Sequence, residues 1–112
     1  MFKKTLLASA ATFVITTTSL MAQDSIDIVF VGKNTGNPYF DSLTQGFVEA
    51  CEKIACNFEF VAPATAEATS QIPFIEAQIQ RGVDVIAISP NSPDALNQVF
   101  DTARAKGITI LT

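Results

Sequence analysis

The chain has 112 residues, of which 48% are hydrophobic, and it carries a formal net charge of −4 at pH 7. It contains no histidine, which excludes a Ser-His-Asp triad, imidazole metal ligands and the usual general base at neutral pH. The acidic balance, without any basic cluster, argues against nucleic acid and anionic membranes as partners.

The first 22 residues have the pattern of a secretory signal peptide. Lys3 and Lys4 precede an apolar, hydroxyl-rich stretch from Leu6 to Leu20, and Ala22 is a suitable small residue before the cleavage point. Leu20 departs from the pattern, because a small residue is preferred there as well. A retained membrane anchor is disfavoured because the stretch falls short of the ~20 apolar residues that a span requires. We therefore expect cleavage before Gln23 and a periplasmic product that is not embedded in a membrane.

Without this leader, residues 23–112 form at most one small domain. The leader contains two lysines and no acid, so its removal lowers the net charge from −4 to −6. Cys51 and Cys56 remain and would meet an oxidising compartment. On a continuous helix their Cα atoms would be too far apart for a disulfide, which would need the helix to end before Cys56. We favour two small buried thiols here, and without His or a CxxC pair we expect no metal site.

Apolar residues alternate along residues 23–112 between strand-like and helix-like spacing. Strands are predicted at residues 25–31, 58–61, 83–88 and 108–112, and helices at 39–55, 70–81 and 92–106. Pro73 fits a helix only within the first turn, and Gly82 is suited to close that helix. Ser92 is the predicted N-cap of the last helix, with Pro93 at its first position and Gly107 just beyond its end.

Strands that alternate with helices predict an α/β fold, a Rossmann-like doubly wound parallel sheet. The chain stops inside a predicted strand with no helix to follow it, so we expect the fold to be incomplete.

In an open parallel sheet, ligands bind beyond the carboxyl ends of the strands. The loop after the first strand brings Lys33, Asn34 and Asn37 ahead of Tyr39 and Phe40. The loop after the third strand adds three neutral hydrogen-bonding side chains, those of Ser89, Asn91 and Ser92. Amides and a cation can bond sugar hydroxyls, and aromatic faces can stack on the ring. The alternative is ordinary loop chemistry, in which the amides shape turns and the aromatic rings belong to the core.

Motifs for other chemistry are missing. The segment Gly32-Lys33-Asn34-Thr35 lacks the order of a phosphate-binding loop, and no GxGxxG is present. The acidic residues provide no catalytic pair at the predicted strand ends. We therefore expect no enzyme activity and no cofactor.

Several segments resemble sugar-binding type I periplasmic binding proteins, the ribose-binding-like group. The similarity extends over residues 25–112 and lies in VGKNTGNPYFDSLTQGFVEA (31–50), in Gln71 with Ile75 and Ile79, in GVDVIAISPNSPDAL (82–96) and in AKGITILT (105–112). The loop around Lys33 looks most like the rhamnose-binding and autoinducer-2-binding branch. One departure is Ala55, where this family usually closes its first helix with Gly.

The resemblance implies the first lobe of a two-lobed protein that closes on a sugar and presents it to an ABC-type permease. By resemblance, Lys33 would bond ligand hydroxyls, Asn37 would shape or line the pocket, Tyr39 and Phe40 would form a stacking wall, and Asn91 would line the cleft. It also implies a monomer without metal or cofactor. The alternative is a secreted sugar-sensing input domain of a chemotaxis or two-component system. A flavodoxin-like enzyme is disfavoured by the missing phosphate loop, and a repressor by the leader standing in place of a helix-turn-helix.

Overall fold

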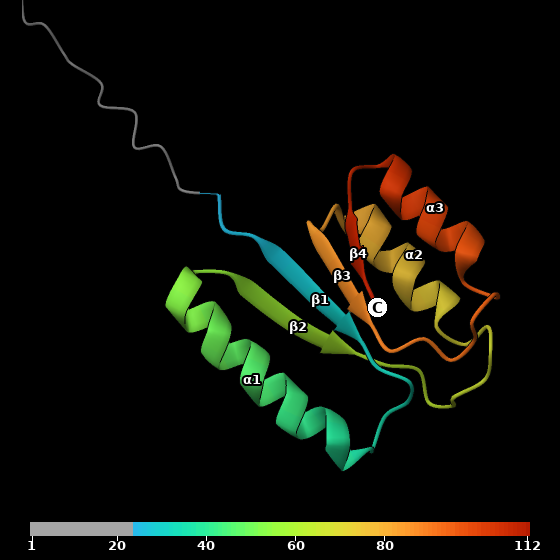
Figure 1. Ribbon diagram of the computed structural model, residues 1–112, viewed down its shortest axis with the longest axis horizontal. Coiled ribbons are helices and arrows are strands. Elements are labelled where there is room, and N and C mark those ends of the chain that lie inside the picture. The colour runs from blue at the N-terminus through green and yellow to red at the C-terminus, as the bar shows by residue number, and fades with distance from the viewer. Residues whose placement is uncertain (1–23) are drawn as a thin grey trace, which may run out of the picture.

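The computed structural model describes residues 24–112, and the predicted signal peptide lies outside this range. Four strands alternate with three helices along the chain (Figure 1). The strands are β1 (Asp27–Val31), β2 (Asn57–Val61), β3 (Val85–Ile88) and β4 (Thr109–Leu111). The helices are α1 (Pro38–Ile54), α2 (Ile72–Arg81) and α3 (Asn97–Ala105). Each predicted element is present, with ends that differ by a few residues.

The strands form one parallel sheet in the order β2-β1-β3-β4. The central strand β1 pairs with β2 on one side and with β3 on the other, so Ile28 lies between Phe58 and Val85. The chain therefore moves in one direction from β1 to β2 and then crosses back past β1 to reach β3. This reversal, together with helices on both faces, confirms the predicted doubly wound α/β sheet.

Alternate residues of each strand face opposite layers of the core. Val29, Val31, Ile86 and Ile88 pack with α2 and α3, whereas Phe30 and Ala87 pack with the aromatic side chains near α1. In Figure 1, α1 accordingly lies on one side of the sheet and α2 and α3 lie on the other. Strands buried on both faces explain why the segments at 27–31 and 85–88 read as nearly continuous apolar runs.

Helix α1 ends at Ile54, two residues before Cys56. Ala55 adopts the left-handed conformation (φ 56°, ψ 48°), and the chain turns back so that Cys56 N donates to Cys51 O at 3.1 Å. The two Cα atoms then lie 4.6 Å apart, and the cysteines form a disulfide. The expectation of two unbonded thiols is therefore wrong, because the helix does end before Cys56.

Helix α2 begins at Ile72 and carries Pro73 in its first turn, where its missing N–H is not needed. Gly82 ends it in the left-handed conformation, as predicted (φ 68°). Helix α3 starts later than predicted. Ser92 Oγ accepts from the backbone N–H groups of Asp94 and Ala95, but these residues form a turn, and the helix begins only at Asn97. Ser92 thus caps the turn that precedes α3, and the prediction of a helix from residue 92 is wrong.

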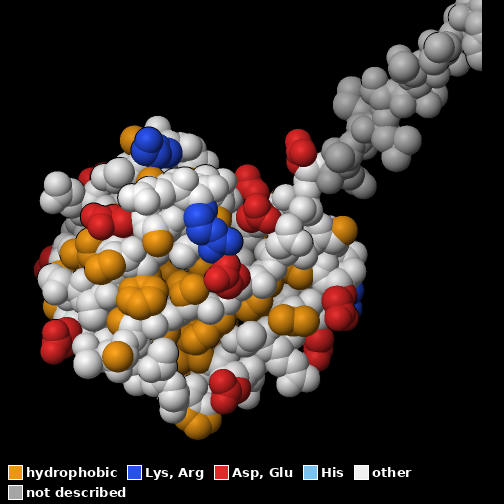
Figure 2. All heavy atoms as spheres, turned by 180° about the vertical axis from the view of Figure 1, so that it is seen from behind, with side chains coloured by type: hydrophobic (Ala, Val, Ile, Leu, Met, Phe, Trp, Pro, Cys, Tyr) orange, Lys and Arg blue, Asp and Glu red, His pale blue; other side chains and the backbone are white. Residues whose placement is uncertain are grey.

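The surface carries no dominant patch of one charge on the face seen in Figure 2, where acidic side chains are scattered and basic ones are few. Within residues 24–112, every helix is too short or too polar to cross a lipid bilayer.

Candidate functional site

The loops that follow β1 and β3 lie side by side, because these two strands are neighbours and run in the same direction. This is the place where the strand order reverses, and in doubly wound sheets it is the usual ligand crevice. Ser89 N donates to Val31 O at 3.2 Å, so the two loops leave the sheet already in contact. We name residues 32–37 the first loop and residues 89–92 the third loop.

Gly32 opens the first loop at a point where no side chain fits. A Cβ atom built there would lie 2.6 Å from Cζ of Phe60, well inside van der Waals contact. Gly32 N donates to Val61 O at 2.9 Å, which holds the start of the loop against the end of β2. The close approach of the aromatic ring therefore explains the glycine.

Lys33 is exposed at the junction of the two loops. Its Nζ donates to the carbonyl oxygen of Pro90 at 2.8 Å, and its own carbonyl oxygen accepts from Asn91 Nδ2 at 2.9 Å. The structure thus brings Lys33 and Asn91 together, as the resemblance implies. An ammonium group has three N–H donors, so the contact with Pro90 leaves two for a ligand.

Asn37 and the two aromatic residues that follow lie at the start of α1. Asn37 Oδ1 accepts from Tyr39 N at 3.1 Å and caps the helix. Tyr39 is 66% exposed, with its ring edge-on to Phe40 at a centroid distance of 5.3 Å. Phe40 is only 3% exposed and packs against Phe30 and Phe60. Tyr39 alone therefore offers an open ring face in this part of the chain, while Phe40 supports it from the core.

Gln71 is a functional candidate that sequence reasoning missed. Its side chain is fully buried, and Nε2 donates to Gly32 O at 2.8 Å and to Ser89 O at 2.9 Å. Its Oε1 accepts from Asn91 N at 2.8 Å. A signal for it exists in the sequence: Gln71 precedes Ile75 and Ile79 at intervals of four, which places an amide on the apolar face of α2.

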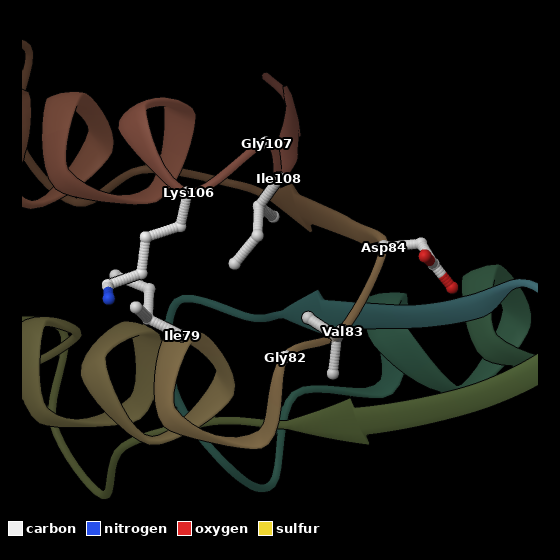
Figure 3. Close-up of a pocket in the computed structure, with 7 residues that line it drawn as sticks. All are labelled: Ile79, Gly82, Val83, Asp84, Lys106, Gly107 and Ile108. Atoms are coloured by element: carbon white, nitrogen blue, oxygen red, sulfur yellow. The ribbon is translucent and has the colours of Figure 1, made fainter.

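A surface cavity lies elsewhere, near the amino ends of β3 and β4. It measures about 420 Å³ and is lined by Ile79 of α2 and by residues that follow α2 and α3: Gly82, Val83, Asp84, Lys106, Gly107 and Ile108. Figure 3 shows Lys106 extending towards Ile79 while Asp84 points away from the other lining side chains. Asp84 Oδ2 instead accepts from Asp27 N at 2.8 Å. With Lys106 as the one polar side chain that extends towards the other lining residues (Figure 3), this cavity offers a sugar fewer hydrogen-bonding side chains than the loop edge does.

Among residues 24–112, no group of three or more acidic or cysteine side chains is gathered closely enough to hold a metal ion. The loop edge is thus built from amides, one ammonium, one phenol ring and backbone groups. Such groups can bind a neutral polyol by hydrogen bonds and stacking.

Comparison with known proteins relates the chain to periplasmic binding proteins. The family profile described as periplasmic binding protein domain matches residues 28–112. The xylose/arabinose-binding protein XylF of Sulfolobus acidocaldarius is 32% identical over 83 residues, which cover 74% of this chain and 21% of that protein.

Solved structures of solute-binding proteins have the same fold. One from Burkholderia graminis, in complex with D-arabinose, has a TM-score of 0.73 and 33% identity over 78% of this chain and 30% of its own. Another from Clostridium phytofermentas, with bound L-rhamnose, has a TM-score of 0.73 and 31% identity over 78% of this chain and 27% of its own. The chain therefore spans about a fifth to a third of the length of these proteins. Since the arabinose-bound and rhamnose-bound structures are about equally similar, the assignment to one branch stays a prediction.

Proposed function

Because the chain belongs to the periplasmic binding protein domain family, we propose that it forms part of the first lobe of a secreted substrate-binding protein. This protein captures a sugar or sugar-like molecule and delivers it to an ABC-type permease. The D-arabinose and L-rhamnose bound in two similar solute-binding proteins support the ligand class. Export by the signal peptide predicted at residues 1–22 would place the protein in the periplasm. There we expect it to be a monomer.

The observation that carries the proposal is the pairing of the first and third loops at the strand-order reversal. Lys33 Nζ lies 2.8 Å from Pro90 O, so a cation from one loop sits directly over the other. Tyr39, at the start of α1 just beyond the first loop, presents an exposed ring. A hydroxyl group can accept from the Lys33 ammonium, and the C–H face of a sugar ring can stack on the phenol ring.

Binding of this kind needs no covalent step. In a two-lobed protein the ligand shifts an equilibrium between open and closed arrangements, and it does so by binding the closed arrangement more tightly. The loop edge of this chain would supply one wall of the closed cleft. We expect the chain alone to bind no sugar tightly, since the opposite wall would be missing.

The test is calorimetry on the whole protein, meaning this chain together with any residues that follow Thr112. The sugars are D-arabinose, L-rhamnose, D-xylose and D-ribose. Lys33→Ala should weaken binding of the preferred sugar by about 10- to 100-fold, the usual effect of losing a hydrogen bond from a charged group. Lys53→Ala is the matched control, because Lys53 is an exposed lysine at the far end of α1.

An unchanged affinity in Lys33→Ala would remove this residue from the site. Failure of the wild-type protein to bind any sugar would contradict the proposed function, and tight binding by the 112-residue chain would contradict the need for a second wall. The alternative role, as a sensory input domain, shares the sugar-binding step and differs in its partner. Co-purification with a permease rather than with a membrane kinase would decide between them.

A further inference from the structure

Gln71 occupies an unusual place for a polar side chain. It stands just before α2, at the N-cap position, yet its side chain makes no cap hydrogen bond to that helix. Its side chain instead extends under the first and third loops and is completely shielded from solvent. A buried amide is costly unless every polar atom is satisfied, so the partners of this group define its role.

The three hydrogen bonds of Gln71 saturate its amide in one orientation. The two N–H groups of Nε2 point to the carbonyl oxygens of Gly32 (2.8 Å) and Ser89 (2.9 Å), one from each loop. Oε1 accepts from the backbone N–H of Asn91 at 2.8 Å. A carboxylate could not donate to the two carbonyls, and an apolar side chain could satisfy none of the three groups.

The network continues from Gln71 to the proposed ligand-binding groups. Asn91, whose backbone is held by Gln71, donates from Nδ2 to Lys33 O at 2.9 Å. Lys33 in turn donates from Nζ to Pro90 O at 2.8 Å. Each loop is therefore fixed relative to the other through one buried amide.

We propose that Gln71 is a positioning residue that locks the first and third loops together, so that Lys33 and Asn91 stand ready before the ligand arrives. This inference rests on the proposed function, because it concerns the same sugar site. Gln71 is buried and contacts no ligand itself. It acts by reducing the loss of freedom that binding would otherwise impose on the two loops.

A purely structural role is the competing explanation, and the chain offers a matched control for it. Gln78 lies on the same helix and is also buried (4% exposed), but its Oε1 accepts only from Arg81, away from both loops. Gln71→Met and Gln78→Met remove the same group from similarly buried positions. A structural role alone would lower stability in both variants and leave the affinity of the folded molecules unchanged.

The experiment compares these two variants in the whole protein, at a temperature where both are folded. We expect Gln71→Met to weaken binding of the preferred sugar by about tenfold or more, and Gln78→Met to leave it within about twofold of the wild type. Amide hydrogen exchange without sugar gives a second reading. The N–H of Asn91 should be protected in the wild type and in Gln78→Met, and should exchange rapidly in Gln71→Met.

Equal affinities in the two variants, or an Asn91 amide that stays protected in Gln71→Met, would overturn the positioning role and leave the proposed function intact. If no sugar binds the wild type, the proposed function fails, and the exchange measurement still decides whether Gln71 locks the loops. Should Gln71→Met not fold, Gln71→Glu replaces it. It keeps an acceptor for Asn91 N–H but loses both donors, and is expected to weaken binding to a similar extent.

Discussion

Substitution of Gly32 by alanine should destabilise the protein through a single steric conflict. The added Cβ would lie 2.6 Å from Cζ and 2.7 Å from Cε2 of Phe60. Carbon atoms in favourable contact are about 3.5–4.0 Å apart, so the ring would have to move by about 1 Å. The backbone of Gly32 is not in the left-handed region, which means that the conflict is with the ring and not with the glycine conformation.

The cost follows from what surrounds Phe60. Its ring stacks on Phe30 at a centroid distance of 6.1 Å and touches Phe40 at 5.6 Å, so a shift is transmitted through the aromatic layer under α1. Overpacking of this kind costs about 1–3 kcal/mol. Loss of glycine freedom in the unfolded chain offsets about 0.4–1 kcal/mol of this. We therefore expect a net destabilisation of about 1–2 kcal/mol.

Urea unfolding of four variants tests this reasoning. Gly46→Ala is the matched control, since Gly46 lies within α1 and a Cβ there meets nothing within 4 Å. It should stabilise the protein by up to about 1 kcal/mol, because glycine is a poor helix former. Phe60→Leu shortens the ring, so the cost of Gly32→Ala should fall by about 1 kcal/mol in that background. A Gly32→Ala variant as stable as Gly46→Ala would refute the argument. So would a Gly32→Ala substitution that destabilises the wild type and the Phe60→Leu variant equally.

Two further predictions concern the end of α1. Replacing both Cys51 and Cys56 by alanine should lower the free energy of unfolding by about 2 kcal/mol, the value expected for a short closed loop. A reducing agent should lower the urea midpoint of the wild type and leave that of the double variant unchanged. Equal stabilities of the oxidised wild type and the double variant would contradict a stabilising disulfide. Ala55→Gly should raise the stability by about 0.5–1 kcal/mol, because Ala55 is left-handed (φ 56°) and glycine adopts this conformation freely. The control Ala77→Gly, within α2, should lower the free energy of unfolding by about 1 kcal/mol. If both substitutions changed the stability in the same direction, the reasoning would be wrong.

The fold was predictable because its signals are local. Strands buried on both faces are apolar throughout, helices carry one apolar stripe, and Pro73 and Gly82 mark the two ends of α2 by their own backbone preferences. Each of these properties depends on a few neighbouring residues. The right-handed connections of parallel β-α units then make a doubly wound sheet the expected fold, whereas the strand order itself comes from the structure.

Features that depend on distant parts of the chain were less accessible. Ser92 is followed by Pro93 and an acid, a good start for a helix, but Leu96 is almost completely buried in the core and the chain completes a turn before α3 begins. The disulfide depended on Ala55 adopting a conformation that glycine usually takes. Alanine gives no local indication of that turn, so the distance between the cysteines was overestimated.

The site shows the same division between local and distant information. Lys33 and Asn91 were candidates because they follow two strands, and the family resemblance predicted them as ligand-binding residues; the structure places the two side by side. Gln71 was not, because its role arises from contacts with Gly32 and Ser89, residues 39 and 18 positions away in the sequence. Both predicted residues lie on loops, where backbone mobility would be high, with Lys33 exposed and Asn91 half-buried. Holding such loops requires a polar group from a rigid element beneath them, and the start of α2 is the element that lies there. An amide in register with the apolar face of a helix, placed in the sequence between two ligand-bearing loops, therefore indicates a positioning residue of this kind.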